Sequence, residues 1–240
     1  MVAFGEVASW MKNDLSGMDD TGLARWTYMT FSGRDGTFTT AVVGYNPCKT
    51  PPTAVKTCYQ QHRHYFTTQQ RNHTCPRQLF HTNLITQLKA WRLEGRRLIV
   101  CLDANEHMYT GSIGKSLTDK NGLDMVEAVS TTTGKQLSAT YFRGSRPIDA
   151  VWCTKDVVIR NACALPIGYG VGDHRAFVVD FTTHSLVGIN PQPIVHPKAR
   201  RLNTKIPGCL EAYTTTLEQD IARHRLIEKL FYSWEDEMDF

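Results

Sequence analysis

Residues 98–107 read LIVCLDANEH, an apolar run that ends at Asp103 and places Asn105 two residues later. An unbroken run of Val, Ile and Leu is typical of a strand buried on both faces, and its end is where side chains first meet solvent. Because side chains alternate along a strand, Asp103 and Asn105 lie on the same side, where both oxygens can bind one metal ion or one phosphate. Asp and Asn also form ordinary turns that close strand ends, so this stretch alone leaves both interpretations open.

The composition is that of an ordinary globular protein with enough chain to bury a core. The 240 residues are 41% hydrophobic and 21% charged. A formal net charge of +4 suits a polyanionic partner but falls short of the basic footprint of dedicated nucleic-acid binders. The sequence has no run of 18 apolar residues and no secretory leader pattern, so we expect no membrane partner and an intracellular location, nuclear or cytoplasmic.

The seven cysteines are odd in number and include no C-x-x-C pair. This usage predicts free thiols in a reducing compartment. One stretch, residues 58–75, is rich in zinc-ligand types, but the spacing is not one of the usual finger patterns. The favoured interpretation is a polar helix followed by a loop, with zinc as the minor alternative. The residue types in question are Cys58, His62, His64, His73 and Cys75.

Strand and helix patterns alternate through the first half of the chain. A short glycine-containing turn, SGRDG, separates two apolar runs and predicts a β-hairpin whose second strand ends at Tyr45. Apolar residues then recur at spacings of three and four, and Gly95 closes that helix. The order of strand, helix and strand is typical of layered architectures. The expected elements are strands at 26–31, 37–45 and 97–102, and helices at 53–71 and 76–94.

The second half predicts a loop at 107–121, a short helix at 123–129, and strands at 150–154 and 176–181. Charged residues stand directly before both of these strands. A stretch rich in Pro, Asn, Lys and Arg then indicates a linker, and the residues after it return to helical spacing with an apolar face that would suit a partner. We therefore expect a domain over 1–183, a linker over 184–206 and a helical extension over 207–240.

Polar side chains gather at the ends of these strands. If the strands lie side by side, carboxylates, an imidazole, an amide and a phenol meet in one cleft. Carboxylate and amide oxygens suit Mg²⁺, a His oriented by an Asp can deprotonate water, and donors such as Tyr stabilise charge on phosphoryl oxygens. The pattern therefore predicts metal-assisted attack on a phosphate. The residues are Tyr45, Asp103, Asn105, Asp149, Asp173 and His174.

Four segments, YNP, LDANEH, RPIDAVW and GDHRAFVVDF, occur in the order in which similar motifs occur in the endonuclease/exonuclease/phosphatase superfamily, which this chain resembles. The hairpin GLARWTYMTFSGRDG further resembles endonuclease domains of non-LTR retroelements, and residues 196–225 resemble the connector toward a reverse transcriptase. The resemblance implies an α+β fold, a four-layer sandwich of two packed mixed sheets flanked by helices, with a C-terminal helical appendage. It also implies hydrolysis of phosphodiester bonds in DNA with Mg²⁺, for which Mn²⁺ can substitute.

The resemblance also assigns roles to the motif residues. Asp103 and Asn105 correspond to residues that position the attacking water and hold the scissile phosphate, and Asp149 to the carboxylate that orients the catalytic His174. Tyr45 corresponds to a phosphate-contacting Tyr. The metal set implied by the resemblance is Asp103, Asn105 and Asp173.

Simpler interpretations stay open for single residues. Asp149 and Asp173 can act as strand-start caps, and His174 can be an interior histidine whose hydrogen bonds are satisfied. Glu106 and His107 are interpreted as loop residues, with His107 as a second candidate for the site.

The sequence departs from the family pattern at its start. The family places an Asn and a metal-binding Glu on earlier segments, whereas MVAFGEV resembles a strand downstream of both. We therefore expect a sandwich without its first strands and a less complete magnesium site, which leaves activity open. The alternatives are a phosphatase of the same superfamily and a non-catalytic nucleic-acid-binding remnant held by basic residues of the tail. Those basic residues are Lys198, Arg200, Arg201, Lys205, Arg223 and Arg225.

Overall fold

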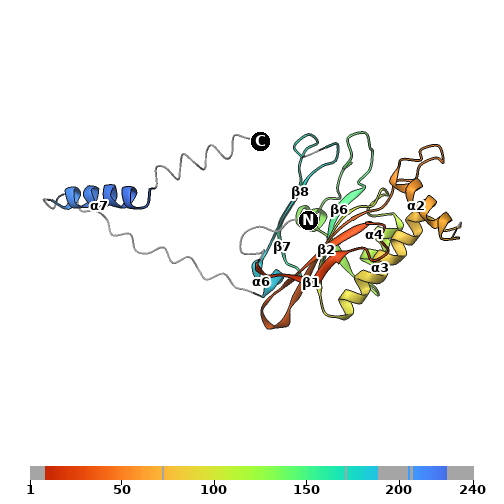
Figure 1. Cartoon of the computed structure of the whole chain (residues 1–240), viewed down its shortest axis with the longest axis horizontal. Coiled ribbons are helices and arrows are strands. Elements are labelled where there is room, and N and C mark those ends of the chain that lie inside the picture. Colours follow the sequence, from red (N-terminus) through yellow and green to blue (C-terminus); the bar gives the residue numbers. More distant parts are fainter. Residues whose placement is uncertain (1–8, 72, 171, 189–204, 206–207, 226–240) are drawn as a thin grey trace. The chain divides into compact units, whose positions relative to one another are not determined.

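The computed structural model describes residues 9–71, 73–170, 172–188, 205 and 208–225 (Figure 1). The chain divides into two units, Met1–Pro191 and Gln192–Phe240. In the first unit, the described residues form a six-stranded mixed sheet, a two-stranded antiparallel sheet and several short and long helices. The fold class is α+β, as predicted.

The six-stranded sheet brings the predicted strand ends to one edge. Strands β3 and β4 are parallel, and β6 runs antiparallel to β4. Their register pairs Tyr45 with Asp103 and Asp103 with Asp149, so the ends of β3 and β4 meet the start of β6. The strand order is β1 (Met11–Met18), β2 (Trp26–Ser32), β3 (Phe38–Tyr45), β4 (Arg97–Asp103), β6 (Asp149–Thr154) and β5 (Met125–Glu127).

The parallel pairing of β3 with β4 requires a crossover, which α2 (Cys58–Thr68) and α3 (Pro76–Leu93) supply. Figure 1 shows α3 lying along the sheet, and its apolar side chains are buried at the expected spacing. Phe80 packs edge-on against Trp26, with 5.9 Å between ring centroids. This packing holds α3 against the start of β2, where Trp26 pairs with Gly44 near the end of β3. The buried apolar residues on α3 are Phe80, Leu84, Leu88 and Trp91.

The smaller sheet consists of β7 (Ile159–Ala164) and β8 (Phe177–Phe181), and α6 (Thr183–Val187) follows it. Phe177, Val179 and Phe181 of β8 are half-buried against the core of the larger sheet. A groove of about 620 Å³ with a mainly apolar lining remains between the two sheets. Its lining includes side chains of both sheets and extends to Asp103 and Asp149 at the strand ends.

Most predicted elements are found within a residue or two of their expected bounds, but α2 covers only Cys58–Thr68 of the helix expected over 53–71, and the region between β4 and β6 differs. The loop expected over 107–121 contains α4 (Ser112–Thr118), and the helix expected over 123–129 is β5 followed by α5 (Ala128–Thr133). Met125 and Glu127 are both buried on β5, a period of two that favours a strand. The Glu127 side chain accepts hydrogen bonds from the N–H groups of Val129 and Ser130, so the helix begins only after it.

Three further elements were not predicted, namely β1, β7 and α6. Strand β1 has the polar sequence MKNDLSGM and is set by its pairing with β2 rather than by an apolar pattern of its own. Residues 184–187, expected in the linker, form most of α6, in which Ser185 and Val187 are buried. Tertiary packing therefore decides these elements, which carry no local signal.

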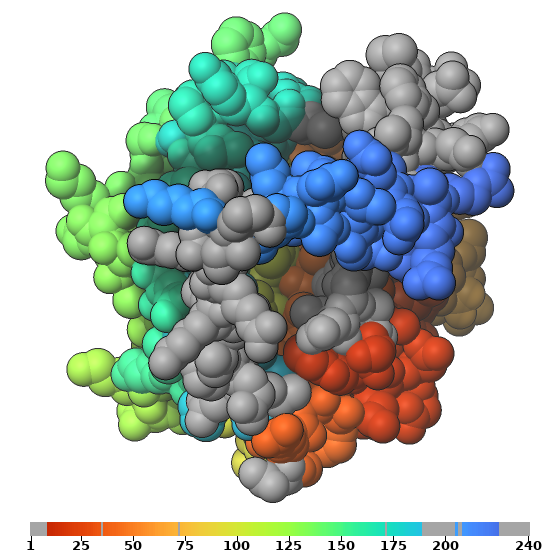
Figure 2. All heavy atoms as spheres, turned by 90° about the vertical axis from the view of Figure 1, so that its left-hand side faces the viewer, coloured from red at the N-terminus to blue at the C-terminus, as the bar shows by residue number. Residues whose placement is uncertain are grey.

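The described part of the second unit contains helix α7 (Cys209–Arg223), drawn in blue in Figures 1 and 2. Its side chains are not buried, and Leu210, Tyr213 and Leu217 project at helical spacing with exposed fractions of 50%, 51% and 44%. A partner for this face stays a prediction. Residues 189–204 of the expected linker and 226–240 of the expected extension lie outside the described residues. Within the described residues, no helix combines the length and apolar character needed to cross a membrane.

Candidate active site at the strand ends

A histidine–aspartate pair forms the centre of the site. His174 Nδ1 lies 2.9 Å from Asp149 Oδ2, and the Asp149 side chain is largely buried. Burial lowers the pKa of His174, but the hydrogen bond and negative charge of Asp149 outweigh it, and the net pKa is raised. A carboxylate in this position fixes the ring with its proton on Nδ1, so that Nε2 can accept a proton from water.

Asp103, the last residue of β4, completes a compact acidic group. Ligand atoms of Asp103, Asp149 and His174 all lie within 4.8 Å of one another, and this is the one such group in the described part of the chain. Burial and the Asp149 charge raise the pKa of Asp103 to about 6, although a hydrogen bond from the Asn105 backbone and the positive charge of Arg77 oppose the rise. Two carboxylates held this close favour a bound cation or a proton.

Asn105 adopts a left-handed backbone conformation, with φ of 47°, that Asn tolerates better than most residues. Its backbone N–H donates to Asp103 Oδ1 at 3.0 Å, which is the turn that the sequence allowed as a simpler interpretation. Its side-chain Nδ2 donates to the Asn46 carbonyl at 2.8 Å. The turn and the site are therefore compatible, because these two hydrogen bonds use the backbone N–H and Nδ2 of Asn105 and not its Oδ1.

Tyr45 on β3 pairs directly with Asp103 on the neighbouring strand β4. Tyr45, Asp103 and Asp149 line the same groove. Its side chain is partly exposed, at 42%, and burial raises the pKa of its phenol. The phenol therefore stays protonated near neutral pH and can donate a hydrogen bond to a phosphoryl oxygen.

Asp173 is placed differently from the other motif residues. It is exposed and lies outside the compact group, although its negative charge helps to raise the pKa of the neighbouring His174. Its backbone carbonyl accepts a hydrogen bond from the Phe142 N–H at 2.8 Å. The structure thus brings Asp103, Asp149 and His174 together and leaves Asp173 at the rim.

The segment at Thr140 and Tyr141 also builds the site, and sequence reasoning missed it. Thr140 is fully buried, and its Oγ1 accepts hydrogen bonds from the N–H groups of Ile148 and Asp149 at 2.9 and 3.1 Å. The Tyr141 ring lies 5.1 Å from the His174 ring between centroids. A Thr-Tyr pair in a polar loop has no periodicity, so only the tertiary structure identifies it.

The other candidates have structural roles. His107 Nδ1 accepts the Tyr109 N–H at 3.3 Å, and His107 is not in the compact group. Glu106 accepts the Ile113 N–H at 2.6 Å at the start of α4. The suggested zinc ligands do not form a group of three in the described part of the chain. Cys58 Sγ lies 3.5 Å from His62 Nε2. Burial raises the pKa of Cys58 and lowers the pKa of His62, which keeps both side chains neutral.

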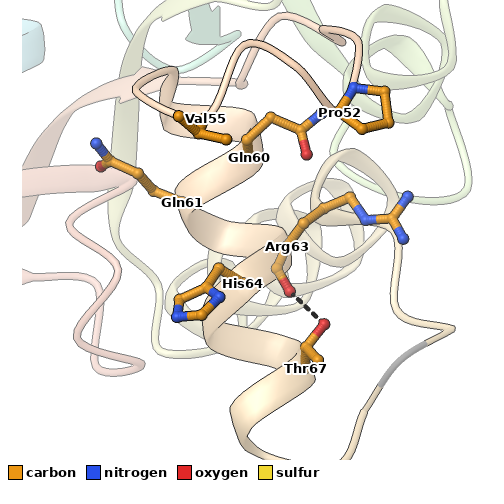
Figure 3. A pocket seen from close by; sticks show the side chains of 7 residues that line it. All are labelled: Pro52, Val55, Gln60, Gln61, Arg63, His64 and Thr67. Atoms are coloured by element: carbon orange, nitrogen blue, oxygen red, sulfur yellow. Dashed lines mark hydrogen bonds between the residues drawn. The ribbon is translucent and has the colours of Figure 1, made fainter.

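A separate hollow of about 550 Å³ lies over α2 and the loop before it (Figure 3). Its side chains are two amides, an arginine, an imidazole, a hydroxyl and small apolar groups, and Thr67 Oγ1 donates to the Arg63 carbonyl at 3.0 Å. It contains no paired acid and base and shares no residue with the strand-end site. The lining residues are Pro52, Val55, Gln60, Gln61, Arg63, His64 and Thr67.

No family model and no curated protein matches the chain. Among solved structures, it is similar to the human Nocturnin catalytic domain with bound sulfate, with 17% identity, a TM-score of 0.42, and 65% of this chain and 53% of that chain covered. It is similar to the Xenopus laevis APE2 catalytic domain, with 16% identity, a TM-score of 0.43, and coverages of 66% and 55%. It is also similar to an endonuclease/exonuclease/phosphatase from Bacteroides vulgatus, with 14% identity, a TM-score of 0.42, and coverages of 65% and 54%.

The chain spans about half the length of these three structures. The chemistry of the site follows from its own residues, namely the motif side chains that meet around Asp149 and His174. The resemblance to retroelement endonucleases in particular stays a prediction. The Bacteroides vulgatus structure carries the name of the superfamily that the four motifs predict, endonuclease/exonuclease/phosphatase.

Proposed function

We propose that this chain hydrolyses phosphodiester bonds in DNA as a magnesium-dependent endonuclease. The observation that carries the proposal is the meeting of the His174–Asp149 pair with Asp103 within 4.8 Å at one sheet edge. In this reaction, His174 Nε2 accepts a proton from the attacking water while Asp149 holds the ring in the required tautomer. Tyr45 donates a hydrogen bond to a phosphoryl oxygen as negative charge builds up there.

The residues present fit a divalent cation. Burial and the charge of Asp149 both disfavour the ionised form of Asp103, and together they raise its pKa to about 6. A bound cation would relieve this repulsion. Asp103 and Asn105 would hold Mg²⁺, since oxygen ligands of this kind are those that Mg²⁺ prefers. Asp173, predicted as a third ligand, lies outside the compact group and would act on the site through its negative charge. When bound, Mg²⁺ supplies charge neutralisation for the phosphoryl oxygens, and Mn²⁺ would substitute for it.

DNA is proposed over a small phosphate ester because of the residues around the site. Phe142, next to the turn of Asp173, is 64% exposed, and Tyr169 in the loop before that turn is 76% exposed. Exposed aromatic rings near a phosphate site suit stacking with nucleic-acid bases. Arg143 is also exposed, and the chain has a net positive charge of +4. The resemblance of the hairpin to retroelement endonucleases supports the same choice.

Nicking of supercoiled plasmid with Mg²⁺ tests the proposal. The wild-type chain should nick, and Asp103→Ala should lower the rate by about 10²-fold or more because the cation and water lose a ligand. Asp156→Ala removes a carboxylate that pairs with Arg92 on the surface and should nick like wild type. Equal rates for wild type and Asp103→Ala would contradict the proposal. Release of phosphate from a phosphoinositide without plasmid nicking would assign the phosphatase alternative instead.

A further inference from the structure

Arg77, the second residue of α3, joins the two loops that end β3 and β4. Its Nη1 donates to the Pro47 carbonyl at 2.8 Å. Its Nη2 is shared between the carbonyls of Ala104 and Asn105, at 3.2 and 3.3 Å. Pro47 lies just beyond β3, and the other two residues lie just beyond β4, so one guanidinium group contacts both strand ends at once.

These two loops are already joined to each other through Asn46, which is 1% exposed. The Asn46 N–H donates to the Asp103 carbonyl at 2.8 Å, and its Nδ2 donates to the Ala104 carbonyl at 2.9 Å. In return, Asn105 Nδ2 donates to the Asn46 carbonyl at 2.8 Å. Arg77 therefore closes a partly buried network that includes the backbone of two proposed site residues, where hydrogen bonds strengthen one another.

The position of this arginine is unfavourable for the helix itself. A cation in the first turn is repelled by the helix dipole, and α3 has no acidic residue in that turn to offset it. Glu106 Oε2 lies 3.7 Å from Nη2, a distance at which it balances charge without a hydrogen bond. The position of the guanidinium group is therefore explained by its hydrogen bonds to the loop carbonyls.

We infer that Arg77 is a positioning residue that fixes the loop of Tyr45 against the loop of Asp103 and Asn105. It contacts backbone carbonyls and no reacting group, so it acts by setting the separation of the phenol from the carboxylate. Lysine cannot replace it, because a single ammonium group lacks the planar fork that reaches both loops. The effect on catalysis rests on the proposed function, whereas the effect on the loops does not.

The test compares Arg77→Lys with Arg92→Lys in the full chain. Arg92 is a matched control because it lies on the same helix and also donates to a carbonyl and a carboxylate, those of Arg96 and Asp156. Native-state hydrogen exchange is measured at the Asn46 and Asn105 amides, which donate to the Asp103 carbonyl and to Asp103 Oδ1. Arg77→Lys should speed both exchanges roughly tenfold, which corresponds to about 1.4 kcal/mol, because charged hydrogen bonds to the loop carbonyls are lost. Arg92→Lys should change neither.

Steady-state nicking provides the second measurement. Arg77→Lys should lower kcat roughly tenfold with little change in KM, because the substrate contacts remain while their geometry loosens. Unchanged exchange at the Asn46 and Asn105 amides would overturn the inference. Equally faster exchange at the buried amide of Leu88 on α3 would overturn it too, because it would indicate a general loss of stability. Faster exchange with an unchanged kcat would also overturn it. A chain without any nicking activity would refute the proposed function and leave the exchange comparison decisive for Arg77.

Discussion

Replacement of Asp103 by Asn should stabilise the metal-free protein at neutral pH. The pKa of Asp103 is raised from 3.8 to about 6 by burial and by the charge of Asp149. Between these two values the folded protein keeps a proton that the unfolded chain has released, so stability falls as the pH rises from about 4 to about 6. Above that range, the ionised carboxylate lowers the free energy of unfolding by a constant amount, whereas an amide does not lower it.

The size of the effect follows from the shift. A shift of about 2 units at about 1.36 kcal/mol each amounts to about 3 kcal/mol. The carboxylate borders the open groove between the sheets, where solvent screens part of this cost, so the expected gain is about 2 kcal/mol. The local hydrogen bond should survive, because the amide oxygen of Asn can still accept the Asn105 N–H that Asp103 Oδ1 accepts at 3.0 Å.

Urea unfolding in EDTA at pH 4, 6 and 8 measures the difference. Asp103→Asn should exceed wild type by about 2 kcal/mol at pH 8 and match it at pH 4, where both side chains are neutral. Asp156→Asn, a surface control, should show no such gain. Added Mg²⁺ should stabilise wild type and not Asp103→Asn. A variant less stable than wild type at pH 8 would refute the reasoning, because the Asp103 carboxylate would then be a favourable group in the folded state.

Three further changes test the site and the core. Asp149→Asn should lower nicking by about 10²-fold or more without unfolding the protein, because an amide can hold His174 in the wrong tautomer; a wild-type rate would count against the role of the pair. Phe80→Ala should cost about 3–5 kcal/mol in urea unfolding, since the ring is fully buried. Thr140→Val leaves two N–H groups unpaired and should cost about 1–3 kcal/mol, whereas Thr140→Ser keeps the acceptor and should cost only about 0.8 kcal/mol, for the lost buried methyl group, by the same measurement.

The elements that can be predicted from the sequence are those whose buried face appears as a periodic pattern of apolar residues. The α3 helix buries one face at helical spacing, and β4 is an apolar run with one face buried and the other half-buried along the groove, so both were predicted within a residue or two. Strands β1 and β7 are polar or irregular and form by pairing with better-defined neighbours. Such strands depend on partners distant in sequence, which a local pattern does not contain.

The same distinction applies to the site. Asp103, Asp149 and His174 could be predicted because each stands at the end of an apolar strand or beside one, and the register then brings them together. Thr140 and Arg77 could not, since one lies in a loop and the other in a helix, and their contacts are with backbone groups. A side chain that supports a site through backbone atoms needs no particular sequence neighbour, so it leaves no motif.

The strand-end site combines two opposing physical demands. The proposed function needs the site's two carboxylates close together in a partly buried place, and this raises the pKa of Asp103 and costs stability in the metal-free protein. The surrounding backbone resists this repulsion: the Asn46 N–H binds the Asp103 carbonyl, and Thr140 binds the N–H of Asp149. Hydrogen bonds to the backbone can hold the two strands in place without neutralising their acidic side chains. Asn46 and Thr140 therefore support the site through the main chain and leave the negative charge of the two carboxylates in place.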